Sequence, residues 1–408
     1  MESDLSQPST KSNWDIFCSV VDNFGDIGVC WRLACNLAQR GRTVRLWVDD
    51  VSPLGWMAPG GYANVEVINC KNGIPKNTNS ALGDVLLDTF DCEFAINLRA
   101  NNAINTQSTD ENSTILESLS EKRPVWLNLE YLTAESFAER AHTLPYVHHS
   151  GAAEGWTQRY FYPGFNGRTG GLLREADLFE RQKAFDRATW LAGLTFEVSD
   201  YSTIKPLNST LSSPRLISLF CYEPTALEAL IDQLAASETQ TCLFVTHGRA
   251  TTAVKAILEG KKRLHPSYLL TEVLLIIYLP QLTQTDFDHL LWSCDLNFVR
   301  GEDSLVRAIW AAKPFIWQIY PQHDGAHHAK LDAFLQMMEA PASLKTAHFA
   351  WNASEDELKT NPYLPPFPQL DLPTCLPTWS ESAENLSNKL RLQADLASSL
   401  IAFAEKNG

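Results

Sequence analysis

The first half of the chain alternates short, mostly apolar runs with amphipathic segments that end at glycine or at polar turns. A helix is predicted over residues 29–40, where apolar positions recur with helical spacing before Gly41. Runs such as VWLNL are typical of strands buried on both faces. The predicted strands are residues 14–21, 43–48, 65–68, 94–98 and 125–129. This alternation indicates a parallel sheet covered by helices.

The middle of the chain interrupts this alternation. Residues 162–171 are glycine-rich and irregular, and residues 176–194 form a predicted helix. Residues 202–214 are polar and contain proline, which predicts a linker or an exposed excursion.

A second alternating series then begins, so the fold class is α/β with two doubly wound, Rossmann-like units that face a cleft. A proline-rich stretch, residues 362–377, is predicted to be an extended crossing, and a final helix, about residues 381–406, to return to the first unit. The predicted strands are residues 215–222, 241–248, 274–280, 296–300 and 314–321, and the predicted helices are residues 225–236, 285–294 and 302–313.

The length of 408 residues allows two or three domains. Residues 1–13 are polar and acidic, unlike a signal peptide, and are expected to form a flexible tail. The predicted division is a tail (1–13), an N-terminal Rossmann-like domain (14–175), a linker helix and loop (176–210), a C-terminal Rossmann-like domain (211–365), and a crossing segment with a returning helix (366–408).

Composition narrows the class of protein. Hydrophobic residues make up 45% and charged residues 20% of the chain, as in soluble globular proteins. The net charge of −15 argues against nucleic acid as the main partner and suits a partner with a cationic side chain. No stretch approaches the ~20 apolar residues of a membrane span. The nine cysteines are scattered without a CxxC pair, which favours reduced thiols in the cytoplasm.

The segment VRGEDSLVRAIWAAK has the layout of an anion site. A strand ends at Arg300, Gly301 turns the chain, and a helix with Ser304 in its first turn follows. Free N–H groups at the helix start, a guanidinium and a hydroxyl would suit a diphosphate. The same residues also fit an ordinary strand–helix connection capped by Asp303 or Ser304. Glu302 would repel phosphate and could accept hydrogen bonds from sugar hydroxyls instead.

Aromatic residues gather near other strand ends of the second half, where a planar base could stack on them. They are Phe220, Tyr222, Phe287 and Tyr320. Helical spacing favours a core position for Phe287, whereas Tyr222 and Tyr320 are expected to be exposed in the cleft.

The segment HDGAHH raises the question of a metal site, because His323 and His327 are four residues apart. No third ligand stands nearby at a recognised spacing, so the sequence predicts no metal site. Asp324 could more simply bind a sugar hydroxyl.

The loop DNFGDIG carries two acids, Asp22 and Asp26, where glycine-rich loops usually receive phosphate. Carboxylates there would repel a diphosphate but suit an acceptor, with one acid as general base and the other orienting the acceptor. Alternatively, Asp26 merely caps the helix and Asp22 supports the turn.

Several long motifs resemble the bacterial elongation factor P arginine rhamnosyltransferases, the EarP family. The motifs are DNFGDIGVCWRLACNLA, LWVDD, FYPGF with RTGGLLRE, SLFCYE and VRGEDSLVRAIWAAKPFIWQIYPQHDGAH, and the resemblance runs from about residue 14 over nearly the whole chain. It implies the two-domain GT-B fold, no metal or cofactor, and inverting transfer of L-rhamnose from dTDP-β-L-rhamnose to an arginine of elongation factor P.

The resemblance also implies roles for individual residues. Asp22 and Asp26 match the family's essential acids, with Asp26 the favoured base, and Glu302 is a third catalytic candidate. Asn23, Phe24 and Gly25 lie between the two acids and are expected to contact substrate. The expected nucleotide pocket is Phe220, Tyr222, Gln284 and Phe287, and the expected diphosphate and sugar contacts are Arg300, Glu302, Asp303, Ser304 and Tyr320.

An acidic loop suits an arginine acceptor, because a guanidinium has a pKa above about 12 and must lose a proton or have its charge offset before it attacks carbon. Two other functions remain open from the residues alone. One is a GT-B nucleotide-sugar enzyme, either a small-molecule transferase or an epimerase. The other is a non-catalytic protein that binds elongation factor P, although the acids at positions 22, 26 and 302 favour an enzyme.

Overall fold

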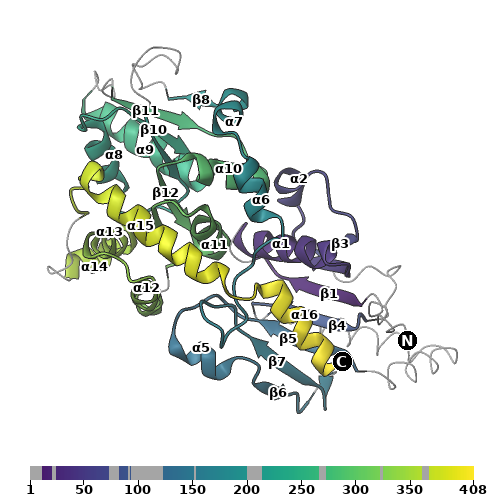
Figure 1. The fold of residues 1–408 in the computed structure, drawn as a ribbon. Coiled ribbons are helices and arrows are strands. Elements are labelled where there is room, and N and C mark those ends of the chain that lie inside the picture. The colour runs from purple at the N-terminus through teal and green to yellow at the C-terminus, as the bar shows by residue number, and fades with distance from the viewer. Residues whose placement is uncertain are drawn as a thin grey trace, which may run out of the picture.

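The computed structural model of the chain consists of two α/β domains, each built around its own sheet (Figure 1). The α/β fold class predicted from the alternating pattern is therefore confirmed. Within the described ranges, no helix combines the length and the apolar character that crossing a membrane requires. The residues described are 12–20, 24–72, 82–90, 92, 123–150, 153–199, 214–265, 273–321, 325–360 and 367–408.

The first domain contains a seven-stranded sheet. Its strands are β1 (Asn13–Cys18), β2 (Thr43–Val48), β3 (Val65–Asn69), β4 (Val85–Thr89), β5 (Val125–Leu129), β6 (Pro145–Val147) and β7 (Thr157–Phe161). Its helices are α1 (Gly25–Gln39), α2 (Leu54–Met57) and α5 (Ser136–Ala141). The strand order is β3-β2-β1-β4-β5-β7-β6, and only β6 runs antiparallel to its neighbour. The chain changes direction across the sheet between β1 and β4, so the loop from β1 to α1 lies at a topological switch point.

Burial on both faces explains the apolar runs of this sheet. Trp14 and Ile16 of β1 pack in one core with Ile27 of α1, whereas Phe17 points to the other face and stacks on Trp47 at 5.9 Å. Strand β4 is fully buried but was not predicted, and the predicted strand at residues 94–98 lies outside the described residues.

The second domain contains a six-stranded sheet in the order β13-β12-β9-β10-β11-β8. Its strands are β8 (Glu197–Val198), β9 (Arg215–Leu219), β10 (Thr241–Val245), β11 (Leu274–Tyr278), β12 (Leu296–Arg300) and β13 (Phe315–Gln318). Only β8 is antiparallel to its neighbour. Its helices are α8 (Leu227–Ala235), α9 (Arg249–Leu264), α10 (Gln284–Ser293), α11 (Gly301–Ala311), α12 (Ala326–Met337), α13 (Ala342–Asn352) and α14 (Glu355–Thr360).

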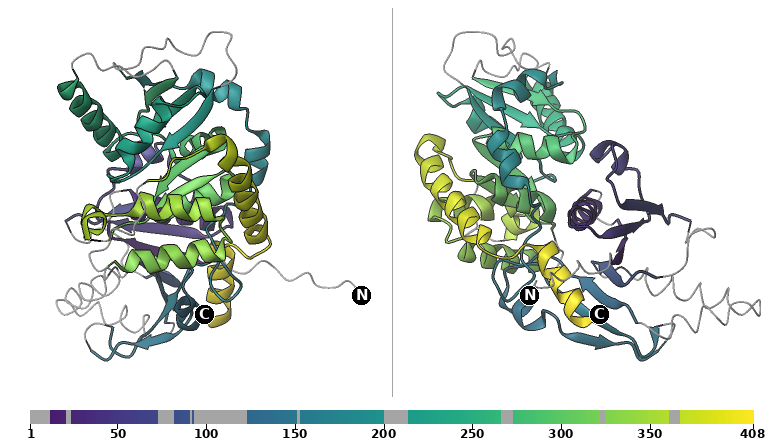
Figure 2. Two further views of the ribbon diagram at one scale, coloured as in Figure 1. Left: turned by 90° about the vertical axis from the view of Figure 1, so that its left-hand side faces the viewer. Right: turned by 45° about the vertical axis from the view of Figure 1, so that its right-hand side comes forward.

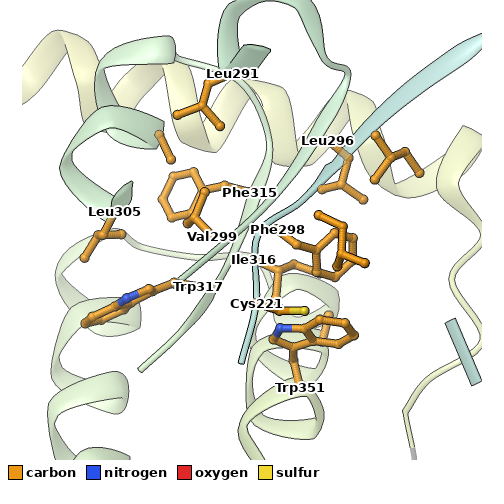
Figure 3. Packing of buried hydrophobic residues seen from close by; sticks show 14 of the residues in the cluster. Cys221, Leu291, Leu296, Phe298, Val299, Leu305, Phe315, Ile316, Trp317 and Trp351 are labelled. Carbon is orange, nitrogen blue, oxygen red and sulfur yellow. The ribbon is translucent and has the colours of Figure 1, made fainter. Parts of the chain in front are cut away.

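Large aromatic side chains pack on both faces of this second sheet near β12 and β13 (Figure 3). Phe298 of β12 packs on Trp351 of α13 with ring centroids 4.5 Å apart. Phe315 and Trp317 of β13 both contact Phe334 of α12. These contacts anchor β12, at whose carboxyl end the predicted anion site begins.

The end of the chain crosses between the domains as two helices, α15 (Leu372–Arg391) and α16 (Leu396–Asn407) (Figure 1). Trp379 of α15 packs in the second domain and Leu400 of α16 in the first. The predicted single helix over 381–406 is wrong, because Asp395 caps a new helix by accepting from the Ser398 N–H. The predicted extended stretch is also wrong from residue 372 on, since α15 accommodates two prolines.

The predicted helix at the start of the linker also needs correction. Residues 176–194 form two helices, α6 (Leu178–Ala184) and α7 (Arg187–Gly193), rather than one. Asp186 begins the second helix by accepting from the N–H groups of Ala188 and Thr189. The polar stretch that follows, residues 202–214, falls almost entirely outside the described residues.

His348 predicts an acid-sensitive step in the unfolding of the second domain. Its side chain is fully buried, its Nδ1 lies 3.0 Å from the Leu344 carbonyl oxygen, and burial lowers its pKa to about 4. Below about pH 6.5 the imidazole binds a proton in the unfolded state, whereas in the folded state it stays neutral down to about pH 4. The free energy of unfolding therefore falls by on the order of 3 kcal/mol between about pH 6.5 and 4. Chemical denaturation across this pH range should show a flatter dependence for His348→Leu, and an unchanged slope would contradict the assignment.

Candidate active site

Two adjoining pockets are lined by residues of both domains. The first, called the narrow pocket, has a volume of about 100 Å³. The second, called the acidic pocket, has a volume of about 600 Å³. Gly25 at the start of α1 and Glu302 in the first turn of α11 line both pockets. A molecule that reaches from one pocket to the other would pass these two residues.

The narrow pocket gathers most of the residues expected to contact the donor. From the second domain it is lined by Phe220, Gln284, Phe287, Arg300, Glu302, Asp303 and Ser304, among others. From the first domain it is lined by Phe24, Gly25, Arg32, Trp56 and Met57. Trp56 and Met57 of α2 were not predicted, because nothing in their local pattern distinguishes them from core residues.

Arg300 is a buried cation at the end of β12. Its guanidinium carbon lies 4.5 Å from the ring centroid of Phe220 and 4.4 Å from that of Tyr222. Its Nη1 donates to the Cys221 carbonyl oxygen at 3.2 Å. Two aromatic rings and a carbonyl thus fix a positive charge on the wall of the narrow pocket, by cation–π attraction and hydrogen bonding.

Helix α11 begins directly after this arginine. Gly301 turns the chain with a φ of 67°, a conformation that glycine adopts easily. The Ser304 hydroxyl accepts from the Arg300 N–H at 3.0 Å and donates to the Arg300 carbonyl oxygen. Ser304 therefore stabilises the turn, as in an ordinary capping arrangement, and also lines the narrow pocket.

The aromatic candidates divide into three environments. Phe220 and Phe287 meet edge to face at 5.4 Å and both line the narrow pocket, although Phe287 also packs against the core. The expected exposure of Tyr222 is wrong, because this residue is only 2% exposed beneath Arg300. The expected exposure of Tyr320 is confirmed at 50%, and its side chain lines the acidic pocket.

Asp26 lines the acidic pocket from the first turn of α1 and is 5% exposed. The helix cap is Phe24, so Asp26 is not the N-cap residue that the alternative interpretation required. Phe24 meets Trp56 edge to face at 5.1 Å beside the narrow pocket. The other two residues of this loop, Asp22 and Asn23, lie outside the described residues.

Further acids and aromatic rings surround Asp26. The acidic pocket also holds Glu130 and Glu135, which sequence reasoning missed, together with the rings of Phe90, Tyr131 and Phe137. A signal for Glu130 was present, because this residue follows directly on the predicted strand at 125–129, at the sheet edge where ligands bind. In the described part of the chain, the pocket is lined by four carboxylates, Asp26, Glu130, Glu135 and Glu302, against one lysine, Lys330. This excess of negative charge suits a cation.

Glu302 joins elements of both domains. One carboxylate oxygen accepts from Lys330 Nζ of α12 at 2.7 Å, and the other accepts from the Leu132 N–H of the first domain at 2.7 Å. Lys330 offsets its charge, so Glu302 can stand close to an anionic ligand in the narrow pocket. Its oxygens remain at the junction of the two pockets.

Asp303 and Gln284 connect the narrow pocket to helix α1. The Asp303 carboxylate pairs with Arg32 at 3.2 Å, and burial raises the pKa of the Asp303 carboxyl against the opposing effect of this arginine. Gln284 Nε2 donates to the Gly28 carbonyl oxygen at 2.9 Å. Arg32 was not among the predicted site residues.

The histidine-rich segment presents a different grouping from the one considered in the sequence. In the part of the chain that the structure describes, His327, His328 and Glu357 hold their ligand atoms within 4.8 Å of one another. His328 Nε2 directly contacts the Glu357 carboxylate. His323 and Asp324 lie outside the described residues, so the pairing of His323 with His327 stays a sequence interpretation.

Comparisons with known proteins identify the family of the chain. The family model for "Elongation-Factor P (EF-P) rhamnosyltransferase EarP" matches residues 14–405. The protein-arginine rhamnosyltransferase of Pseudomonas aeruginosa is 36% identical over 96% of this chain and 98% of that protein. The Pseudomonas putida enzyme of the same name is 38% identical over 85% of this chain and 88% of that protein.

A solved structure supports the same assignment. It concerns EarP-mediated arginine glycosylation of translation elongation factor EF-P, and it aligns with a TM-score of 0.58 and 27% identity over 98% of this chain and all of that one. The predicted GT-B fold class is confirmed by the two facing Rossmann-like domains together with this likeness. The resemblance seen in the motifs is thus confirmed, and the chain belongs to the EarP family of elongation factor P rhamnosyltransferases.

Proposed function

We propose that the chain transfers L-rhamnose from dTDP-β-L-rhamnose to one arginine side chain of elongation factor P, with inversion at the anomeric carbon. One observation carries this proposal: a pocket that contains the fixed cation Arg300 adjoins a pocket that contains the acid Asp26. The names of the relatives and the EarP structure support both the acceptor and the sugar.

The narrow pocket is the proposed donor site. Phe220 and Phe287 offer ring surfaces for the thymine base. Arg300 and the N-terminus of α11 offer positive charge for the diphosphate. The sugar would then point toward Glu302, whose oxygens stand where the two pockets meet.

The acidic pocket is the proposed acceptor site. Its carboxylates suit a guanidinium, and the rings of Tyr131 and Phe137 suit the hydrocarbon part of an arginine side chain. Asp26 stands in the wall next to Gly25, the residue shared with the donor pocket. The guanidinium of an arginine bound here would lie next to Asp26 and face the sugar in the donor pocket.

The proposed reaction follows from these positions. Asp26 takes a proton from the guanidinium while the arginine nitrogen forms a bond to the anomeric carbon. The bond from that carbon to the phosphate oxygen breaks, and dTDP leaves with its electron pair. Attack from the face opposite the diphosphate converts the β-linked donor into an α-rhamnosyl arginine.

The proposed transfer uses no metal ion and no cofactor and takes place in the cytoplasm, where the acceptor factor works. Arg300 and the α11 N-terminus can stabilise the charge that develops on the leaving diphosphate. Transfer in the presence of a chelating agent, at the rate seen without it, is the expected outcome.

Mass measurement tests the proposal directly. Elongation factor P incubated with this protein and dTDP-β-L-rhamnose should gain the mass of one deoxyhexose residue, and a factor whose acceptor arginine is replaced by lysine should gain none. Conversion of the donor in the absence of the factor would instead indicate an epimerase. Binding of the factor without any mass gain would indicate a non-catalytic partner.

A further inference from the structure

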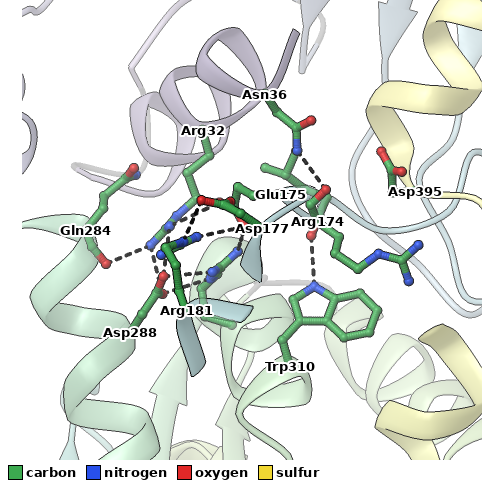
Figure 4. Close-up of polar contacts among 12 residues, drawn as sticks. Arg32, Asn36, Arg174, Glu175, Asp177, Arg181, Gln284, Asp288, Trp310 and Asp395 are labelled. Atoms are coloured by element: carbon green, nitrogen blue, oxygen red, sulfur yellow. Dashed lines mark hydrogen bonds and ion pairs between the residues drawn. The ribbon is translucent and has the colours of Figure 1, made fainter. Parts of the chain in front are cut away.

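Arg32 of helix α1 reaches across the domain boundary. Its side chain is 5% exposed, and its Nη2 donates to Asp288 Oδ1 and to the Gln284 carbonyl oxygen, both at 3.2 Å (Figure 4). Its Nε lies 3.2 Å from Asp303 Oδ1. These contacts with α10 and α11 are called the Arg32 bridge, and they join the helix that carries Asp26 to the domain that carries the donor pocket.

The carboxylates around Arg32 differ in their dependence on it. Asp288 is held from its own domain by Arg307, through two hydrogen bonds of 2.8 and 2.7 Å. Glu175 also pairs with Arg307, at 2.7 Å. Asp303, by contrast, forms its ion pair within the described residues with Arg32, which belongs to the other domain. Separation of the domains would therefore leave Asp288 paired, but it would break the direct ion pair of Asp303 and leave only the more distant electrostatic attraction of Arg307.

The size of the narrow pocket requires such a separation. A volume of about 100 Å³ is well below the ~300–1,000 Å³ of pockets that hold drug-sized ligands. Its two walls come from different domains, with Trp56 and Met57 on one side and Phe287 and Arg300 on the other. A nucleoside diphosphate sugar can enter only if these walls move apart, and that movement breaks the Arg32 bridge. Figure 2 shows that α1 lies at the face of the first domain that meets the second.

Helix α1 connects the bridge to the proposed base. Asp26 and Arg32 are six residues apart on one continuous helix, a rise of about 9 Å. A helix of this length moves as a rigid element, so the position of Arg32 fixes the position of Asp26. The contact from Gln284 Nε2 to the Gly28 carbonyl adds a second tie along the same helix.

We infer that Arg32 is a positioning residue that forms its contacts with Asp303, Asp288 and Gln284 when the domains close and thereby sets Asp26 against the bound donor. This role rests on the proposed function of Asp26 as the base. Arg32 contributes to turnover without being a ligand of the nucleotide, since its donors are directed to protein oxygens.

The test is an Arg32→Gln variant measured in three ways. At saturating substrates its kcat should fall by about 30- to 100-fold, because a small displacement of the base is costly. Its affinity for dTDP alone should stay within about threefold of the unmodified protein, since closure is not required for the nucleotide to bind. X-ray scattering without donor should give a larger radius of gyration, because the closed arrangement has lost its bridge.

Arg40→Gln is the matched control. Arg40 directly follows the same helix as its C-cap residue and pairs with Asp395 at 2.9 Å, away from both pockets, so its loss should leave kcat and the radius of gyration as they are. If Arg32→Gln does not fold, Arg32→Lys serves instead. A lysine keeps the positive charge but can make only some of the hydrogen bonds of the Arg32 guanidinium, so an intermediate loss of kcat is expected.

Two results would overturn the inference. A loss of dTDP affinity of more than about tenfold in Arg32→Gln would make Arg32 a donor ligand. An unchanged radius of gyration with unchanged kcat would show that the bridge does not control closure. If the unmodified protein transfers no rhamnose, the proposed function fails, while the scattering comparison still decides whether Arg32 holds the domains together.

Discussion

Replacement of Asp26 by asparagine is expected to lower kcat for rhamnosyl transfer by about 10³-fold, the usual scale for loss of a general base. Asparagine has nearly the same shape as aspartate, so the first turn of α1 and the buried environment of the side chain should persist. The amide cannot accept the guanidinium proton, and the acceptor nitrogen then remains without a free lone pair. Single-turnover measurement of the mass gain on elongation factor P gives the rate.

Glu135→Gln is the charge-matched control for this prediction. It removes one negative charge from the same pocket but leaves the acid beside Gly25 in place. We expect a higher KM for the acceptor, by up to about tenfold, with a smaller effect on kcat, because a pocket carboxylate contributes mainly to binding of the cation. Asp26→Asn should bind dTDP with normal affinity. If Asp26→Asn kept more than about a tenth of the kcat of the unmodified protein, Asp26 would not be the general base.

The strands of the fold were the most predictable part. The predictions at residues 43–48, 125–129 and 296–300 coincide with β2, β5 and β12. Each is mostly apolar, mostly buried and flanked by a strand on both sides, and such burial leaves a strong local signal. The helix ends were less predictable, as at α1, which begins at Gly25 rather than at residue 29. The first turn of α1 lines a pocket, so its residues do not follow the amphipathic pattern from which helices are predicted.

The local sequence also identified Arg300 and Asp26, one in each pocket, but not the residues that hold them in place. Arg300 and Asp26 stand out because each lies where the chain passes from a strand into a helix. Tyr222 was misassigned, because a tyrosine beside polar residues resembles a cleft residue, while its actual partner is the guanidinium of Arg300. The Arg32 bridge carries no local signal, since Arg32 and Asp303 are 271 residues apart in sequence. Such a pair becomes visible only when the two domains are placed together.

Replacement of Arg300 by glutamine is expected to weaken dTDP binding by about 100-fold, the scale of one charge-assisted hydrogen bond to a phosphate. The side chain stacks between Phe220 and Tyr222, so its charge is fixed at the pocket wall before the donor arrives. Thymidine lacks the diphosphate, and its weaker affinity should change little. Calorimetric titration with dTDP and with thymidine separates the phosphate contribution from that of the base.

Arg249→Gln provides the matched comparison, because Arg249 also lies over the Tyr222 ring, at 4.8 Å, and pairs with Glu223. Arg249 is not among the residues that line the narrow pocket, so its loss should change dTDP affinity by less than about threefold. If both arginine variants weakened dTDP equally, the effect would come from the general positive field around Tyr222. If Arg300→Gln weakened thymidine as much as dTDP, Arg300 would support the base platform rather than the diphosphate. A selective loss with dTDP and Arg300 alone is the result that places the leaving group against β12 and α11, opposite the acid on α1.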